Sequence, residues 1–234
     1  MCGRFAFFEL LRFLDELREG GVPFIRDEHY HFMPGYNVAP RSTITVLLGD
    51  EGRNVLANAQ WGLIPHWAES MPKVRPVNAR TEGLAGRRYF RHMLNRRHCI
   101  IPVSGFYEWS DQRNASVKSP WYIHRANERP MALAGLWDRW QPPGEERPPL
   151  TSCTIITTAA NPDMRPIHQR MPVILEPETW QEWLDAGDSS AARLLRPAEA
   201  GVIGLHRVSR RINNPQYIRK DCIAPVGEDE ETGA

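Results

Sequence analysis

Long apolar runs are absent from this sequence of 234 residues. No stretch approaches the roughly 18 consecutive apolar residues of a membrane-spanning helix, which argues against an integral membrane protein. The first residues also lack the basic region, apolar stretch and cleavage site of a secretory signal. With 41% hydrophobic and 24% charged residues, the composition is that of an ordinary globular protein. We therefore expect a soluble protein that acts in the cytoplasm at the nucleoid, without a membrane partner.

Cysteine is scarce, and the four cysteines form no recognisable metal or disulfide pattern. Cys2, Cys99, Cys153 and Cys222 lie far apart, and no C-x-x-C pair occurs. Disulfide-dense secreted domains and zinc fingers both require closer and repeated spacing. We therefore expect reduced thiols, no metal site and no cofactor.

Lysine is also rare, because only Lys73, Lys118 and Lys220 are lysines among the 29 basic residues. The net charge is +1, and leaving out the four acids of the last eight residues gives +5 for the rest of the chain. The planar guanidinium of arginine binds phosphate with two hydrogen bonds, so the arginine excess suits a nucleic-acid partner. A compositional bias of the genome would produce the same excess.

The apolar pattern predicts strands through the middle of the chain and few helices. We expect strands over 43–48, 55–61, 99–109, 121–124, 131–137 and 152–158. We expect helices over 8–17, 83–97 and 177–186. Short connections favour an α+β fold with a mainly antiparallel, partly closed β-sheet or barrel and a few peripheral helices. We expect one domain over 1–226 and an acidic, disordered tail over 227–234.

Cys2 has the most direct chemical implication. Methionine aminopeptidases remove Met1 when the second side chain is small, and the chain would then begin with an amine and a thiol on one residue. Ordinary pKa values are about 7.7 for the amine and about 8.5 for the thiol, so both groups are partly nucleophilic near neutral pH. An aldehyde can form an imine with this amine, and the thiol can then close a thiazolidine ring. A Met-Cys start by itself is more often incidental, so the interpretation depends on the rest of the chain.

Six short motifs follow one another along the chain. They are Met1-Cys2-Gly3-Arg4-Phe5, Tyr36-Asn37-Val38-Ala39-Pro40, Trp61-Gly62-Leu63-Ile64-Pro65-His66-Trp67, Val77-Asn78-Ala79-Arg80-Thr81-Glu82, Gly105-Phe106-Tyr107-Glu108-Trp109 and Pro166-Ile167-His168-Gln169-Arg170-Met171-Pro172. Together they closely resemble the SRAP family, named for SOS response-associated peptidases, whose members sense abasic sites in single-stranded DNA. The resemblance spans about 2–226. It implies that Cys2 crosslinks to abasic DNA, with Asn78, Glu108 and His168 around it and with an abasic-site lyase as a side activity.

The chemistry of an imine agrees with these roles. Losing water from a carbinolamine and opening a sugar ring both require a group that donates and accepts protons, for which Glu108 and His168 are candidates. Asn78 offers a donor and an acceptor without competing for protons. On a strand, Glu108 shares a face with Phe106, so it would lie on a partly apolar surface. A carboxylate paired with an arginine, and an asparagine at a strand end, are the structural alternatives for Glu108 and Asn78.

DNA binding requires contacts to the phosphate backbone and a stacking surface. Arg4, Arg80, Arg88 and Arg170 lie in or beside the motifs and are the predicted phosphate ligands, while Trp67 is the predicted stacking residue. The expected partner is single-stranded DNA with abasic sites, including sites at junctions with duplex, bound by a monomer.

Two other functions fit parts of the sequence. A peptidase or amidohydrolase with a terminal cysteine nucleophile would use Cys2 and a histidine, and it would also need an oxyanion hole. A non-covalent single-strand binder would need only arginine and tryptophan, and Cys2 would be dispensable.

Overall fold

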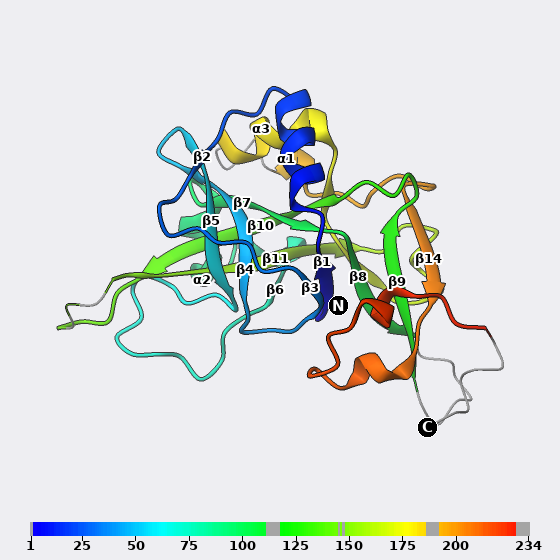
Figure 1. Ribbon diagram of the computed structural model, residues 1–234. Helices are drawn as coiled ribbons and strands as arrows, with labels where there is room; N and C mark the ends of the chain where they lie inside the picture. Colours follow the sequence, from blue (N-terminus) through cyan, green and yellow to red (C-terminus); the bar gives the residue numbers. More distant parts are fainter. Residues whose placement is uncertain (1, 111–117, 145, 147, 186–191, 228–234) are drawn as a thin grey trace.

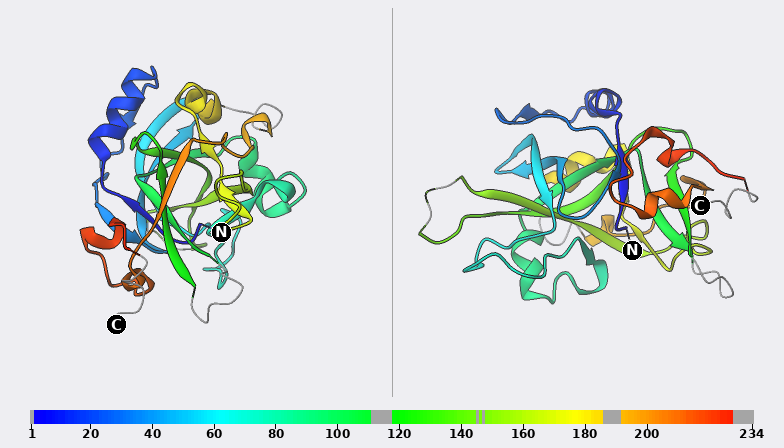
Figure 2. Two further views of the ribbon diagram at one scale, coloured as in Figure 1. Left: turned by 90° about the vertical axis from the view of Figure 1, so that its right-hand side faces the viewer. Right: turned by 60° about the horizontal axis from the view of Figure 1, so that its bottom comes forward.

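The computed structural model describes residues 2–110, 118–144, 146, 148–185 and 192–227, apart from the side chain of Arg88. Five strands close into a barrel in the order β11-β10-β7-β4-β5, and β5 pairs with β11 to complete the ring (Figures 1 and 2). These strands are β4 (Thr43–Asp50), β5 (Arg53–Trp61), β7 (His98–Val103), β10 (Met131–Trp140) and β11 (Leu150–Ala159). The β5–β11 pair is parallel and the other four pairs are antiparallel. Closure leaves these five strands without an open edge.

Four short strands extend the barrel, and two of them matter for the site. β6 (Asn78–Arg80) runs parallel to the end of β11, and β12 (Arg170–Pro172) runs antiparallel to it. Their registers overlap at Thr157, which is opposite both Arg80 and Pro172. The end of β11 therefore brings two distant motifs together. The other two strands are β2 (Ile25–Arg26), beside β5, and β13 (Ile174–Leu175), beside β10.

A second, antiparallel sheet packs beside the barrel in the order β14-β9-β8-β1-β3 (Figure 1). Its strands are β1 (Phe5–Phe7), β3 (Gly35–Val38), β8 (Gly105–Ser110), β9 (Ser119–Arg125) and β14 (Ile203–Arg207). The strand run predicted over 99–109 is in fact two strands, because the chain leaves the barrel at Ser104. There the Ser104 amide donates to the Ala6 carbonyl (2.7 Å) and the Ser104 hydroxyl accepts from the Phe8 amide (3.2 Å).

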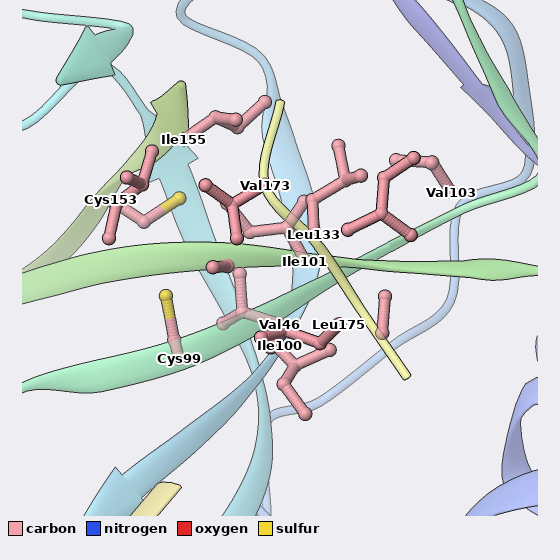
Figure 3. Packing of buried hydrophobic residues seen from close by; sticks show 14 of the residues in the cluster. Val46, Cys99, Ile100, Ile101, Val103, Leu133, Cys153, Ile155, Val173 and Leu175 are labelled. Carbon is pink, nitrogen blue, oxygen red and sulfur yellow. The ribbon is translucent and has the colours of Figure 1, made fainter. Parts of the chain in front are cut away.

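The main core fills the barrel and continues to the inner face of the second sheet. Figure 3 shows Cys99, Ile101, Leu133 and Cys153 among the buried side chains of the barrel strands. Gly135 permits this packing, since a Cβ there would lie 2.8 Å from the Cys99 sulfur. Full burial of a large apolar side chain contributes about 1.5–3 kcal/mol, so this cluster is the main source of stability.

In the part of the chain that the structure describes, three α-helices with defined bounds lie outside the strands. They are α1 (Leu10–Glu19), α2 (Arg88–Leu94) and α3 (Trp180–Asp185). α1 packs on α3 through Phe13 and Trp180, whose ring centroids are 5.6 Å apart (Figure 1). No helix in the described part of the chain combines the length and the apolar character needed to cross a membrane.

The predicted helices are present with changed bounds. In α1, Phe13, Leu14 and Leu17 are buried while Leu11 is 75% exposed. The apolar residues at 11, 14 and 17 are three residues apart, and this spacing drifts around a helix of 3.6 residues per turn. α2 is shorter than the predicted 83–97, since a 3-10 turn (Thr81–Gly83) and Gly86 precede it. The segment predicted over 177–186 is a 3-10 turn (Pro177–Thr179) followed by α3.

The expected fold class is confirmed: helices are few, both sheets are mainly antiparallel, and one of them closes into a ring. Apart from Gly227, the acidic tail predicted over 227–234 lies outside the described residues. The single domain over 1–226 stays a prediction.

Candidate functional site

Cys2 lies just before β1, where the second sheet meets the barrel, and its side chain is 0% exposed. The Asn78 side-chain amide, from β6, donates to the Cys2 carbonyl at 2.8 Å. The Tyr107 amide, from β8, donates to the Arg4 carbonyl at 2.9 Å and so extends the β1–β8 pairing toward Cys2. The backbone at Cys2 is therefore fixed by elements of both sheets.

Glu108 is a buried carboxyl whose negative charge acts on the Cys2 thiol. It is 4% exposed on β8, directly opposite Trp121 of β9. Phe106 packs in the main core while Tyr107 packs in a second cluster on the other face of the sheet, so the predicted alternation of β8 is confirmed. Glu108 thus shares the face of the sheet that is turned toward Cys2 and the barrel.

The Cys2 thiol differs from the sequence expectation of a partly ionised group. Burial, and then the negative charge of Glu108, raise the pKa of this thiol well above its ordinary value. The neutral thiol is therefore the form present near neutral pH. A reaction at Cys2 therefore needs a base that deprotonates the thiol, or it starts at an atom other than the sulfur.

Asn78 has one side-chain atom that is satisfied and one that is not. Its amide nitrogen donates to Cys2, whereas its Oδ1 is buried and accepts no hydrogen bond from the described residues. Leaving a buried acceptor unpaired typically costs about 1–3 kcal/mol. An acceptor in this position beside Cys2 can receive a hydrogen bond from an amine or a hydroxyl.

His168 is half-buried in the turn before β12. Its own amide donates to the Met164 carbonyl at 3.0 Å, and its Nδ1 lies 2.9 Å from the Arg170 amide nitrogen. The same Nδ1 also lies 3.2 Å from the Arg170 carbonyl, so the tautomer of the ring decides which of these two contacts with Arg170 is a hydrogen bond. The His168 imidazole, a group that can donate and accept protons, therefore lies near the end of β11 that also borders Asn78 and Arg80.

Arg170 and Arg80 lie on either side of β11. Arg170 binds Glu82 and donates to the Thr157 carbonyl at 2.6 Å. The hydrogen bond between Arg170 and Glu82 lowers the pKa of Glu82 to about 2. Arg80 is exposed and lies on the same face of β6 as Asn78. Thr157, which is opposite Arg80, was missed by the sequence analysis because nothing distinguishes it from other residues of a strand.

The remaining predicted DNA ligands lie in different surroundings. The Arg4 guanidinium donates to Asn37 and to the Ile212 carbonyl rather than facing open solvent. Trp67 is 53% exposed and meets Tyr89 edge-on, with ring centroids 5.8 Å apart. These two rings line a surface depression of about 390 Å³. Arg88 is the first residue of α2, and its side chain lies outside the described atoms.

The site is built from neutral and ionisable side chains. Across the described ranges, no three His, Cys, Asp or Glu side chains are grouped to hold a metal ion. The structure brings Asn78 and Glu108 to Cys2, and it brings His168, Arg170 and Arg80 to the end of β11. This arrangement can bind a carbonyl compound and move protons beside Cys2.

Comparison with known proteins identifies the family. The family described as "SOS response associated peptidase (SRAP)" matches residues 1–215. The Bacillus subtilis protein named abasic site processing protein YoqW is 38% identical over 229 residues, covering 95% of this chain and 99% of that protein. The Gallus gallus protein named abasic site processing protein HMCES is 32% identical over 231 residues, covering 83% of this chain and 67% of that protein.

Solved structures agree on the fold. A crystal structure of a Bacteroides thetaiotaomicron protein superimposes with a TM-score of 0.78 at 22% identity, covering 97% of this chain and 98% of that one. At this identity the likeness concerns the fold alone. The family model and the Bacillus relative each match most of the chain, and the motifs around Cys2, Asn78, Glu108 and His168 were the signal that predicted this result. The chain belongs to the SOS response associated peptidase (SRAP) family.

Proposed function

We propose that this protein processes abasic sites in single-stranded DNA by forming a covalent thiazolidine link through Cys2 after Met1 is removed. The observation that carries the proposal is the convergence of Asn78 and Glu108 on a buried Cys2. The names of the relatives, which are abasic site processing proteins, support the same substrate. The protein acts as a monomer, on single strands and at their junctions with duplex.

The reaction starts at the amine. The freed Cys2 amine attacks the aldehyde carbon of the opened sugar and gives a carbinolamine, which loses one water to form an imine. The sulfur then bonds to the imine carbon, and the thiol proton ends on the nitrogen. One aldehyde and one aminothiol thus give one thiazolidine and one water. The raised pKa of the Cys2 thiol supports this order, because a neutral thiol does not compete with the amine in the first step.

Three side chains assist these steps. Glu108 relays protons, because its charge acts on the Cys2 thiol. It protonates the departing water, regains a proton from the nitrogen as the imine forms, and passes the thiol proton to the nitrogen when the ring closes. His168 donates a proton to the sugar ring oxygen and so favours the open aldehyde. Asn78 orients the amine through its Oδ1, which accepts no hydrogen bond from the described residues, and through its hydrogen bond to the Cys2 carbonyl. If the imine does not close, the acidified neighbouring C–H allows strand cleavage by β-elimination, a lyase side activity.

The DNA is held by its backbone and by stacking. Arg80 is exposed beside Asn78 and flanks the lesion as a phosphate ligand. Arg170, across β11, binds a second phosphate in exchange for its ion pair with Glu82, with Arg88 further along. Trp67 and Tyr89 form an edge-to-face aromatic pair, and the exposed Trp67 ring suits stacking on a base.

A denaturing gel separates this function from its two alternatives. Protein whose mass shows loss of Met1 is incubated with an abasic single-stranded oligonucleotide, with the intact oligonucleotide and with a generic peptide. The proposal predicts a heat-stable adduct with the abasic strand alone. Peptide cleavage without an adduct would favour a peptidase, and binding to both strands without an adduct would favour a non-covalent binder.

A further inference from the structure

We infer that Arg4 and Asn37 form a hydrogen-bonded link, here called the latch, between residues 210–217, here called the arm, and the segment just before β1. This latch positions Cys2. The inference rests on the proposed function for its main readout. It assigns Arg4 a positioning role in place of the phosphate contact that the sequence suggested.

The Arg4 guanidinium is engaged within the protein. Its Nη1 donates to Asn37 Oδ1 at 2.6 Å and to the Ile212 carbonyl at 3.0 Å. The same guanidinium lies over the Trp109 ring, 6.0 Å from the centroid. Burial lowers the pKa of Arg4, yet a guanidinium stays charged at neutral pH, so a partly buried cation is held by neutral oxygens.

Asn37 completes the latch from β3, where it is 4% exposed. Its Nδ2 lies 3.3 Å from the Ile212 carbonyl, 3.1 Å from the Asn214 carbonyl and 2.8 Å from the Tyr217 carbonyl, and its two hydrogens are shared among these three acceptors. These carbonyls belong to the arm, which follows β14. The buried Asn37 amide therefore binds three backbone carbonyls of the arm, and Arg4 donates to one of the same carbonyls, that of Ile212.

The latch is connected to Cys2 through the backbone of Gly3 and Arg4. β1 lies between β3 and β8, and the Arg4 carbonyl accepts from the Tyr107 amide on the β8 side. On the other side, the Arg4 side chain is tied to Asn37 and the arm. Beyond Arg4, the hydrogen bond from Asn78 to the Cys2 carbonyl is the next attachment. Loosening the latch would therefore let the Cys2 backbone move relative to Glu108, and small misplacements of reacting groups cost large factors in rate.

Arg80 provides the contrast. Its side chain is exposed, whereas that of Arg4 is shared among protein acceptors. A phosphate ligand that is neutralised reduces the slope of binding against salt by about 0.7 for single strands. A positioning residue lowers the crosslinking rate and leaves that slope unchanged.

The test compares wild type, Arg4→Gln, Asn37→Ala, the double variant and Arg80→Ala. Crosslinking rates are measured at saturating abasic oligonucleotide, and binding to intact single strands is measured over a range of salt. We expect Arg4→Gln and Asn37→Ala each to slow crosslinking about 10-fold or more with an unchanged salt slope. The double variant should be no slower than the slower single one, because both break one network. Arg80→Ala should reduce the slope.

Amide hydrogen exchange supplies a readout that does not depend on crosslinking. Exchange at Tyr107, which donates to Arg4, should become faster in both latch variants, while exchange at Ala134 in the barrel stays unchanged. A reduced salt slope in Arg4→Gln, or wild-type crosslinking with wild-type exchange at Tyr107, would overturn the latch. Absence of crosslinking in the wild type would instead defeat the proposed function, and the exchange result would still decide whether the latch holds the strand.

Discussion

For the substitution Glu108→Gln, a role in proton transfer and a purely electrostatic role predict opposite effects on the crosslinking rate. Replacing Glu108 by glutamine keeps the shape and the buried position on β8 but removes the ability to exchange a proton and, with it, the negative charge of the carboxylate. General acid–base catalysis typically contributes 10²–10⁴-fold, so Glu108→Gln should slow crosslinking by about 100-fold or more. The negative charge of Glu108 also raises the pKa of the Cys2 thiol, so its removal lowers that pKa and makes the thiolate easier to form. If thiolate supply limited the rate, the variant would therefore be faster.

The assay is a single-turnover time course with abasic oligonucleotide in excess, quenched by heat and read on a denaturing gel. Because Glu108 is buried, affinity for the intact strand should stay within about twofold of wild type. Glu178→Gln, an exposed carboxyl in the 3-10 turn before α3, is the matched control and should react at the wild-type rate. A rate for Glu108→Gln equal to or above that of wild type would refute the proton-transfer role.

Four further outcomes follow from the same site. Cys2→Ser should form an imine that borohydride traps but no heat-stable adduct, and it should nick abasic DNA, because a hydroxyl cannot close an equivalent ring. A bulky residue inserted after Met1 should abolish adduct and nicking on the same gel, because the Cys2 amine then stays blocked. Arg80→Ala should weaken binding to single strands and lower its salt slope by about 0.7 in a titration over salt. Arg170→Ala should remove a stabilising contribution of Glu82, whose lowered pKa of about 2 makes that contribution present above an unfolded pKa near 4.5 and lost as the pH falls toward 2. Thermal melting over this pH range checks it, and identical pH profiles for Arg170→Ala and wild type would contradict it.

The sequence predicted the parts of the fold that depend on local pattern. The long runs at 43–48, 131–137 and 152–158 are strands of the barrel, since each is rich in apolar and β-branched residues. The short strands β6 and β12 were not predicted, because three residues give no period and their pairing with β11 is set by tertiary contacts. The split at Ser104 was also missed, as nothing local marks the point where a chain changes sheets.

In the candidate site, too, the residues with a local motif were predicted, whereas properties that depend on tertiary contacts were not. Cys2, Asn78 and Glu108 were named from motifs, and the structure brings them together. The raised pKa of the Cys2 thiol could not be predicted, because it arises from complete burial against a core assembled from distant strands. The partners of Arg4 were hidden for a related reason: its acceptors lie 33 and 208 residues away in sequence.

The most direct test of the central claim is the intact mass of the heat-stable adduct combined with alkylation of its thiols under denaturing conditions. We expect a mass equal to the protein without Met1 plus the abasic strand less one water. We also expect alkylation at Cys99, Cys153 and Cys222 but not at Cys2, whose sulfur is held in the ring. An adduct of that mass with Cys2 alkylated would be an open imine, and an adduct that retains Met1 would use another nucleophile; either result would contradict the thiazolidine.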